Sequence, residues 1–203
     1  MTRASIKLPQ PELKGKTSVE ETISGRRSAR RFRAGPLLLP QLSQLLWSAQ
    51  GITGAGGRRA APSAGATYPL EIFCVVGEQT IEGLSAGIYH YEAASHSLSL
   101  HLKGDLRQEL AEAALNQSYI ATTPVNIVVC AIFSRTCYRY GRRGEGYVYM
   151  EAGHAGQNIA LQAIALGLVT LMVGAFEDEG VSKILEVEEQ IKPLYIIPIG
   201  TPA

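Results

Sequence analysis

Cysteine is scarce in this sequence: there are three in 203 residues, and no two of them have CxxC spacing. An odd count without that spacing argues against a disulfide framework and against a zinc site, and it fits a reducing cytoplasm. The first ten residues also lack the apolar stretch of a secretory signal. We therefore expect a cytoplasmic protein.

Charge is absent from residues 155–176, a stretch long enough to cross a bilayer. Polar side chains interrupt this stretch, and Gly167 falls where a helix would stop. The stretch is better divided into a buried helix and a buried strand, so we expect no membrane contact.

Several well-known active-site motifs are missing. There is no P-loop, HExxH or GxSxG pattern, and the glycines at 51–57 do not match GxGxxG, because Arg59 stands at the last position. Glu151 and His154 have the ExxH spacing of di-iron proteins but no second copy exists, so we expect no metal. No RRM, KH or OB signature occurs, and we expect no nucleic acid.

Acidic residues and lysine are missing from residues 22–70, although seven arginines lie there: Arg26, Arg27, Arg30, Arg31, Arg33, Arg58 and Arg59. Guanidinium groups bind phosphates and carboxylates through paired hydrogen bonds. The whole chain has a net charge of only +1, so this segment is unusually basic. It predicts an anion site, with phosphate as the first candidate; a solvated basic turn is the alternative.

The composition is that of a globular protein, with 46% apolar and 18% charged residues. We expect a single domain, 1–203, in which 1–16 form a peripheral arm. The mixture of elements predicts an α+β fold with a mainly antiparallel sheet flanked by helices. Helices are expected at 17–25, 39–50, 105–116, 148–166 and 179–185. Strands are expected at 70–77, 87–93, 96–103, 126–133, 168–176 and 193–200.

Four further segments could carry function. Residues 51–66, rich in glycine and alanine, predict an ordered loop. The small residues of 61–69 could let a flat ring approach the backbone, or form a compact turn. The tyrosines and arginines of 138–143 could position or protonate a substrate, or form a basic surface loop. A set of polar residues is expected to share one helical face and to pair across a helix interface: Glu151, His154, Gln157 and Asn158.

Several motifs occur in the same order as in a known family. They are RRSARRF, APSAGATYPLEIF, GIYHYE, EAGHAGQNIALQA, GLVTLMVGAF and PLYIIPIG. Together they resemble the flavin-dependent nitroreductase superfamily. The branch they resemble most is the SagB-type dehydrogenases, which include azoline oxidases of thiazole and oxazole peptide biosynthesis. The resemblance runs from about residue 17 to residue 200.

The resemblance implies a nitroreductase-like α+β fold, an obligate-type homodimer and FMN bound at the subunit interface. Carried over by position, Arg26 and Ser28 would hold the FMN phosphate, and Arg27 the phosphate or the ribityl chain. Arg30 would lie beside N1 and the C2 carbonyl, where a guanidinium stabilises the negative charge of the reduced ring. A second phosphate ligand is the alternative for Arg30.

Other segments would meet the ring itself. Pro62, Ser63 and Ala64 would face the flavin from the partner subunit. Val173 and Gly174 would lie along the ring, with the Gly174 N–H directed at N5, the atom that accepts hydride.

Gln117, within one residue of register, would lie near the pyrimidine edge of the flavin. The helix with His154 and Gln157 would form much of the dimer interface. One departure from the family is the lack of a basic residue after the last strand that would also bind the phosphate. Arg58 and Arg59 are candidates to replace it.

A second departure concerns the reaction. Azoline oxidases resemble Arg139 and Tyr140 but have lysine before the tyrosine, and arginine is a poor general base because it stays protonated. Tyr140 could still donate a proton. The resemblance thus implies a catalytic set of Gly174, Arg30, Tyr140 and Arg139.

The expected function is that of an FMN-dependent oxidoreductase. NADH or NADPH would reduce FMN at N5, and the reduced flavin would pass electrons to a small conjugated acceptor of nitroaromatic or quinone type. One alternative is an azoline-type dehydrogenase or oxidase acting on a peptide, with Tyr140 and Arg139 handling protons. An alternative of another class is a non-catalytic FMN-binding module. The sequence distinguishes neither NADH from NADPH nor the direction of the reaction.

Overall fold

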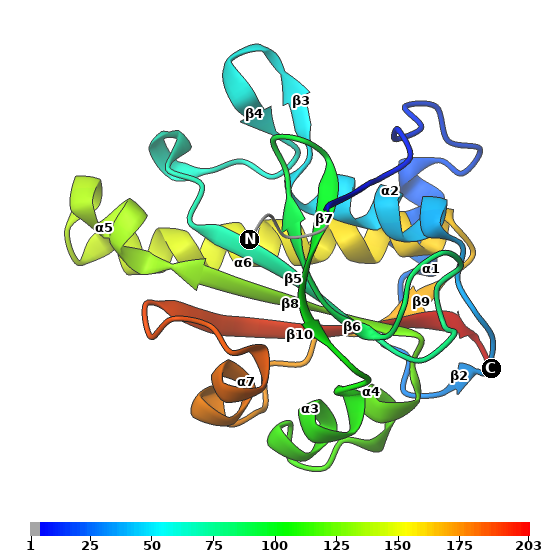
Figure 1. Ribbon diagram of the computed structural model, residues 1–203. Coiled ribbons are helices and arrows are strands. Elements are labelled where there is room, and N and C mark those ends of the chain that lie inside the picture. The colour runs from blue at the N-terminus through cyan, green and yellow to red at the C-terminus, as the bar shows by residue number, and fades with distance from the viewer. Residues whose placement is uncertain (1–4) are drawn as a thin grey trace.

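A computed structural model describes residues 5–203 (Figure 1). Residues 1–4, where the expected peripheral arm starts, lie outside the described residues. The rest of that arm is docked on the body: β1 (Ser5–Lys7) pairs with a sheet strand, and the Ser43 hydroxyl donates to the Pro9 carbonyl at 2.6 Å.

The centre of the molecule is an eight-stranded sheet in the order β1-β7-β6-β5-β8-β10-β2, with β9 paired to β10. Its named strand pairs are antiparallel, which confirms the expected sheet type. The strands other than β1 are β2 (Phe32–Arg33), β5 (Leu70–Val76), β6 (Gly87–Glu92), β7 (Ser97–Lys103), β8 (Val125–Ile132), β9 (Val169–Thr170) and β10 (Ile191–Pro202).

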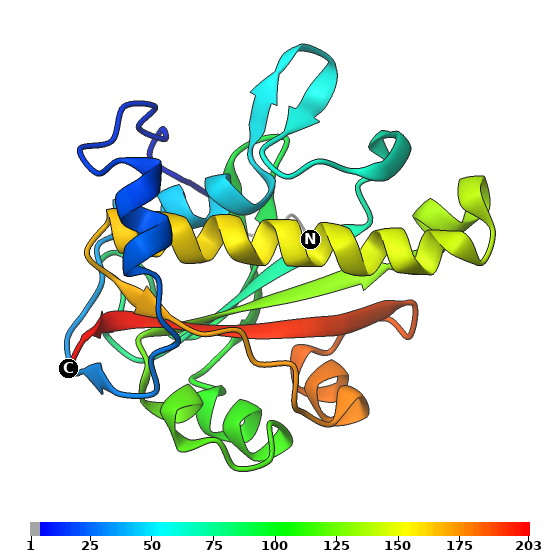
Figure 2. The same cartoon turned by 180° about the vertical axis from the view of Figure 1, so that it is seen from behind.

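Helices cover both faces of the sheet (Figures 1 and 2). On one face lie α1 (Val19–Gly25), α2 (Leu39–Gln50) and α6 (Arg143–Ala165). On the other lie α3 (Arg107–Ala113), α4 (Ser118–Thr122) and α7 (Asp178–Leu185), while α5 (Phe133–Tyr140) follows β8 at one end of the molecule. No helix among residues 5–203 is long and apolar enough to span a membrane.

The apolar run of β5 follows from its position between two cores. Ile72 and Cys74 pack into the core under α2 and α6, whereas Phe73 and Val75 pack into the core under α3, α4 and α7. Successive side chains of a strand point to opposite faces, so a strand covered on both faces is apolar throughout. Burial raises the pKa of the Cys74 thiol and keeps it protonated.

A capping box fixes the start of α1. The Glu21 N–H donates to Ser18 Oγ at 3.1 Å, and the Ser18 N–H donates to the Glu21 carboxylate at 2.7 Å. This reciprocal capping box pairs two backbone N–H groups at the helix start. The helix ends at Gly25, so the arginine segment starts immediately after it.

Two helical segments differ from the sequence expectation. The connection expected before residue 148 is helical: it forms α5 and the first turn of α6, which are separated by Gly141 at φ 57°. The helix expected at 105–116 ends at Ala113, because Leu115 and Asn116 have left-handed φ values of 57° and 59°. Asp105 accepts the Arg107 N–H at 3.2 Å, but it lies one residue before Leu106, the N-cap of α3.

Two other segments are also corrected. The strand expected at 168–176 pairs continuously only at Val169–Thr170, with one isolated bridge at Val173, so the rest of this segment is free of the ladder. The loop expected at 51–66 contains a small hairpin of β3 (Ile52–Gly54) and β4 (Arg58–Arg59) that projects from the body (Figure 1). A short 3-10 turn, η2 (Ala64–Ala66), follows.

Candidate functional site

The residues singled out in the sequence fall into two groups in the structure. The edge group lies along the outer edge of β10 and comprises Arg26, Arg27, Ser28, Arg30, Gln117, Val173 and Gly174. The loop group lies where η2 meets α5 and comprises Pro62, Ser63, Ala64, Arg139 and Tyr140. Figures 1 and 2 show α5 at one end of the molecule, and α1 and β9 toward the other.

β9 holds the arginine segment in place. Ser28 forms a parallel bridge with Thr170, and the Ala29 N–H donates to the Thr170 carbonyl at 3.1 Å. Within residues 5–203, no carboxylate forms an ion pair with Arg26, Arg27 or Arg30. The edge group therefore presents three uncompensated cations beside the Ser28 hydroxyl, a donor set that suits a phosphate.

An exposed glycine continues this edge. Val173 exchanges two hydrogen bonds of 2.9 Å with Ile196 of β10, which fixes the chain just before Gly174. In the described part of the chain the Gly174 N–H has no acceptor, and a Cβ at this position would meet only the Tyr195 ring, at 3.9 Å. Gly174 thus offers an open backbone donor on a flat surface.

Gln117 holds the segment around Gly174 in position. Its side-chain amide donates to the carbonyls of Ala175 and Ala114, both at 2.8 Å, and its carbonyl oxygen accepts the Tyr119 hydroxyl. The structure therefore places Gln117 near Gly174 and engages its amide within the protein, and its expected place at the pyrimidine edge of the flavin stays a prediction. Its visible role is to fix the chain that carries Gly174.

Sequence reasoning missed Tyr195. The half-buried ring of this β10 residue lies between α6 and the segment that carries Gly174. It is 3.9 Å from the Cβ positions of both Gly156 and Gly174. In the sequence it stands inside an apolar run, where it is indistinguishable from a core residue. Only the position of β10 beside Gly174 shows that it forms part of this surface.

The loop group is built on an unusual backbone. The backbone φ values of Gly65, Ala66 and Tyr68 are 59°, 55° and 46°, which residues other than glycine rarely adopt. Three residues of α5 hold the loop: Arg135 donates to the Tyr68 carbonyl at 3.1 Å, Thr136 shares a 2.8 Å hydrogen bond with Thr67, and Arg139 donates to the Gly65 carbonyl at 3.2 Å. The loop and α5 therefore form one unit.

Arg139 and Tyr140 both lie against Gly65. A Cβ on Gly65 would be 2.5 Å from Tyr140 Oη and 2.9 Å from Arg139 Nη1. The Tyr140 ring packs edge-on against Tyr147, with 5.2 Å between ring centroids. The structure thus brings the two residues together with the 62–64 segment, and it gives Arg139 a structural contact that the sequence did not reveal.

The two arginines left open as extra phosphate ligands lie away from Arg26. Arg58 is exposed on the projecting hairpin. Arg59 donates to Gln50 Oε1 at 2.9 Å, and its guanidinium lies 4.5 Å from the centre of the Tyr68 ring. Arg59 thus belongs to the support of the loop group and does not join the arginines of the same chain's edge group.

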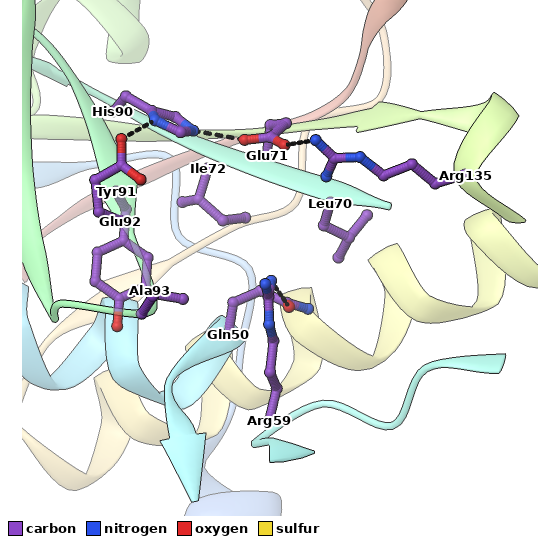
Figure 3. A pocket seen from close by; sticks show the side chains of 11 residues that line it. Gln50, Arg59, Leu70, Glu71, Ile72, His90, Tyr91, Glu92, Ala93 and Arg135 are labelled. Atoms are coloured by element: carbon purple, nitrogen blue, oxygen red, sulfur yellow. Dashed lines mark hydrogen bonds and ion pairs between the residues drawn. The ribbon is translucent and has the colours of Figure 1, made fainter. Parts of the chain in front are cut away.

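A polar cavity of about 210 Å³ lies beside the loop group (Figure 3). In its wall His90 lies between Glu71 at 2.6 Å and Glu92 at 2.9 Å, and Glu71 also pairs with Arg135 at 2.6 Å. Burial opposes charging of His90, but the two carboxylates outweigh it and raise its pKa. Burial likewise opposes the charge of Glu71, but His90 and Arg135 lower its pKa overall.

This cluster ties β5 and β6 to α5 through Arg135. It is an electrostatic clamp rather than a ligand set, because both ring nitrogens of His90 are already paired. Residues 5–203 contain no group of three His, Cys, Asp or Glu side chains that could hold a metal ion.

The polar residues of α6 do not share one face, which corrects the sequence expectation. Glu151 is buried against α2, and the Asn158 amide donates to the Ser48 carbonyl at 3.0 Å. His154 and Gln157 are exposed instead. Residues seven apart in a helix align on one face, whereas the two between them are rotated away by the 3.6-residue repeat. The exposed side of α6 also carries Tyr149 and Met150: together these are the α6 surface.

Comparison with known proteins places this geometry in a family. The model of the nitroreductase family matches residues 23–201. The chain belongs to the nitroreductase family. A relative in Methanocaldococcus jannaschii, named as a nitroreductase, is 42% identical over 195 residues, with 96% of this chain and 95% of the relative covered.

Two further proteins resemble the chain. A crystal structure from Ralstonia eutropha, also named as a nitroreductase, has a TM-score of 0.85 at 27% identity and covers 98% of this chain and 90% of the other. The microcin B17-processing protein McbC of Escherichia coli is 31% identical over 144 residues, which are 68% of this chain and 53% of McbC. The resemblance expected from the motifs, including its SagB-type branch, is confirmed, and so is the fold.

Proposed function

We propose that this nitroreductase is an FMN-dependent oxidoreductase that works as a homodimer. Each FMN would lie between the edge group of one protomer and the loop group of its partner. The observation that carries the proposal is the separation of the two groups in space. The family resemblance assigns both groups to one ligand, yet they lie in different parts of the molecule. The α6 surface, which exposes Tyr149 and Met150 beside His154 and Gln157, supports an interface between copies.

The donor set fits FMN. Arg26, Arg27 and Ser28 would hold the phosphate through charge-assisted hydrogen bonds, and Arg30 would stand at the carbonyl edge of the ring. The unengaged Gly174 N–H would donate to the ring nitrogen, since no side chain covers it. When bound, FMN supplies a ring that accepts and returns a hydride at N5.

The protein's own residues would control that chemistry. A fixed guanidinium at Arg30 stabilises negative charge in the ring without reorganisation, which is the usual role of a preorganised cation. Pro62, Ser63 and Ala64 would cover the ring from the partner and exclude water. Tyr140 would donate a proton to the substrate, which would lie between the flavin ring and the loop group.

We further infer that NADH or NADPH is the reductant and that the acceptor is a small conjugated molecule of nitroaromatic or quinone type. We place the protein in the cytoplasm, where its three unpaired cysteines stay reduced. We propose neither a nucleic-acid partner nor a membrane partner.

The test is an anaerobic titration of the purified protein in the visible range. FMN should bind in a one-to-one ratio with protomers and show flavin absorbance, and NADH or NADPH should bleach it rapidly. A protein that refuses FMN would overturn the proposal. A flavoprotein that neither nicotinamide reduces would contradict the nicotinamide step and would be either a non-catalytic FMN-binding module or the azoline-type enzyme described next.

A second candidate function follows from the likeness to McbC and from the Arg139 and Tyr140 pair. It is the removal of a hydride and a proton from an azoline ring in a peptide, which forms the new double bond, with O₂ as the final acceptor. Arg139 argues against it, because its guanidinium stays charged and donates to the Gly65 carbonyl. Oxidation of a thiazoline peptide by the wild type would favour this function; activity that appears only in Arg139→Lys would show that one residue separates the two reactions.

A further inference from the structure

A closed set of side-chain contacts lies beneath the loop group. Five residues from α2, β4, the η2 loop and α6 take part, and we name them the Glu151 ring: Gln50, Arg59, Ser63, Tyr68 and Glu151. The sequence separates these residues by up to 101 positions, so only the fold brings them together.

The contacts can be followed around the ring. Arg59 donates to Gln50 Oε1 at 2.9 Å, and the Gln50 amide donates to Glu151 at 3.4 Å. Ser63 Oγ accepts the Tyr68 N–H at 2.9 Å, and the Ser63 side chain lies near enough to Glu151 to lower the pKa of its carboxyl group. The Arg59 guanidinium over the Tyr68 ring closes the circle.

The Glu151 ring explains how a carboxyl group can be buried in the core. Glu151 is only 2% exposed and Gln50 only 1% exposed, and a carboxyl at such a depth persists only if it is hydrogen-bonded. Burial raises the pKa of Glu151, while the Ser63 and Gln50 side chains and the charge of Arg59 oppose this rise. Each polar group of the ring is thus matched by another.

The ring also explains how the loop keeps its shape. Ala66 and Tyr68 have left-handed φ values, so the segment would relax to another conformation unless contacts held it. Arg135, Thr136 and Arg139 hold it from the side of α5. Glu151 acts on the loop from beneath through Gln50 and Arg59, whose guanidinium lies 4.5 Å from the centre of the Tyr68 ring.

We propose that Glu151, supported by Gln50 and Arg59, is a positioning residue for the loop from Ser63 to Tyr68. It would touch neither FMN nor substrate. Its catalytic consequence rests on the proposed function, and because the loop would serve the partner's site, Glu151 would act across the subunit interface.

The test compares Glu151→Leu, which removes the acceptor at similar volume, with Glu151→Gln, which keeps a hydrogen-bonding oxygen. Amide hydrogen exchange is measured without FMN. Loop amides at 63–68 should exchange about tenfold faster in Glu151→Leu, the change expected for one lost buried hydrogen bond, whereas Glu151→Gln should resemble the wild type. Amides of β5 and β8 should be unchanged.

Ser63→Ala provides a second variant should Glu151→Leu not fold, and it should show the same local loosening. Loop exchange unchanged in both variants, or a rise of equal size in loop and sheet, would overturn the proposal. With FMN present, kcat should fall in Glu151→Leu and recover in Glu151→Gln; a full kcat in a loosened Glu151→Leu would contradict the catalytic part. A wild type that binds no FMN would refute the proposed function only, since the exchange result stands without flavin.

Discussion

At the residue scale, some arginines of this protein form ion pairs with carboxylates and others do not. Arg107 pairs with Asp105 at 2.6 Å and Arg135 with Glu71 at 2.6 Å, whereas Arg26 and Arg30 pair with no carboxylate in residues 5–203. Guanidinium groups without a carboxylate partner remain free to pair with an external anion. The lack of nearby acidic residues in the sequence agrees with these missing ion pairs, and the anion site itself stays a prediction.

Arg26→Ala should weaken FMN binding by about 1.5–3 kcal/mol, the usual cost of losing a hydrogen bond to a charged group. Fluorescence titration of FMN measures the change in Kd. Arg33→Ala is the matched control, because it removes an equal charge from the exposed β2. Equal effects of the two substitutions would show that only net charge matters, and would contradict the phosphate assignment.

His90 and Glu71 should make stability depend on pH in opposite directions. The folded pKa of His90 lies above its unfolded value near 6.5, so its contribution is complete below pH 6.5 and disappears as pH rises through the folded pKa. The folded pKa of Glu71 lies below 4.5, so its contribution is complete above that value and disappears as pH falls.

The free energy of unfolding of His90→Gln, compared with the wild type, should therefore differ most between about pH 5 and 6 and least at alkaline pH. Urea denaturation at a series of pH values measures the difference. A difference that is constant from pH 5 to 9 would show that His90 stays neutral between its two carboxylates.

At the scale of elements, hydrophobic periodicity predicted the segments that pack into the core, but not where helices and strands begin and end. Strands β5 and β8 and the middle of α6 follow from their apolar pattern. The first turn of α6 does not, because it is stabilised by close packing on α5: a Cβ on Gly144 would lie 2.9 Å from Cys137 Cα. The segment after β9 is apolar but bridges β10 only at Val173, and Gly174 is exposed just beyond that bridge.

Gly65→Val should destabilise the unit of α5 and the η2 loop. The new side chain would meet Tyr140 and Arg139 at a backbone with φ 59°, so we expect a loss of roughly 1–3 kcal/mol in the free energy of unfolding. Gly146→Ala is the control: a Cβ there meets nothing within 4 Å, and alanine favours the helix. Chemical denaturation of both variants compares them; equal stability would mean that the loop moves away freely.

At the scale of the whole molecule, the sequence predicted the family and the sheet type, and it proposed site residues without showing how they divide in space. The motif with Arg26 and the motif with Ser63 look like neighbours along the chain, yet they end in separate groups. Linear order carries no information on that separation, which depends on where β9, β10 and α5 lie in the fold. Tyr195 and the Glu151 ring were hidden for the same reason.

The most direct test of the divided site is to mix two defective proteins, Arg26→Ala and Gly65→Val. Each homodimer should bind FMN weakly, because each carries the same defect in both sites. A mixed dimer should contain one intact site, formed by the edge group of the Gly65→Val protomer and the loop group of the Arg26→Ala protomer. We predict one tightly bound FMN per mixed dimer, measured by flavin absorbance after gel filtration; mixed dimers that bind FMN no better than their parents would show that both groups serve the site of a single chain.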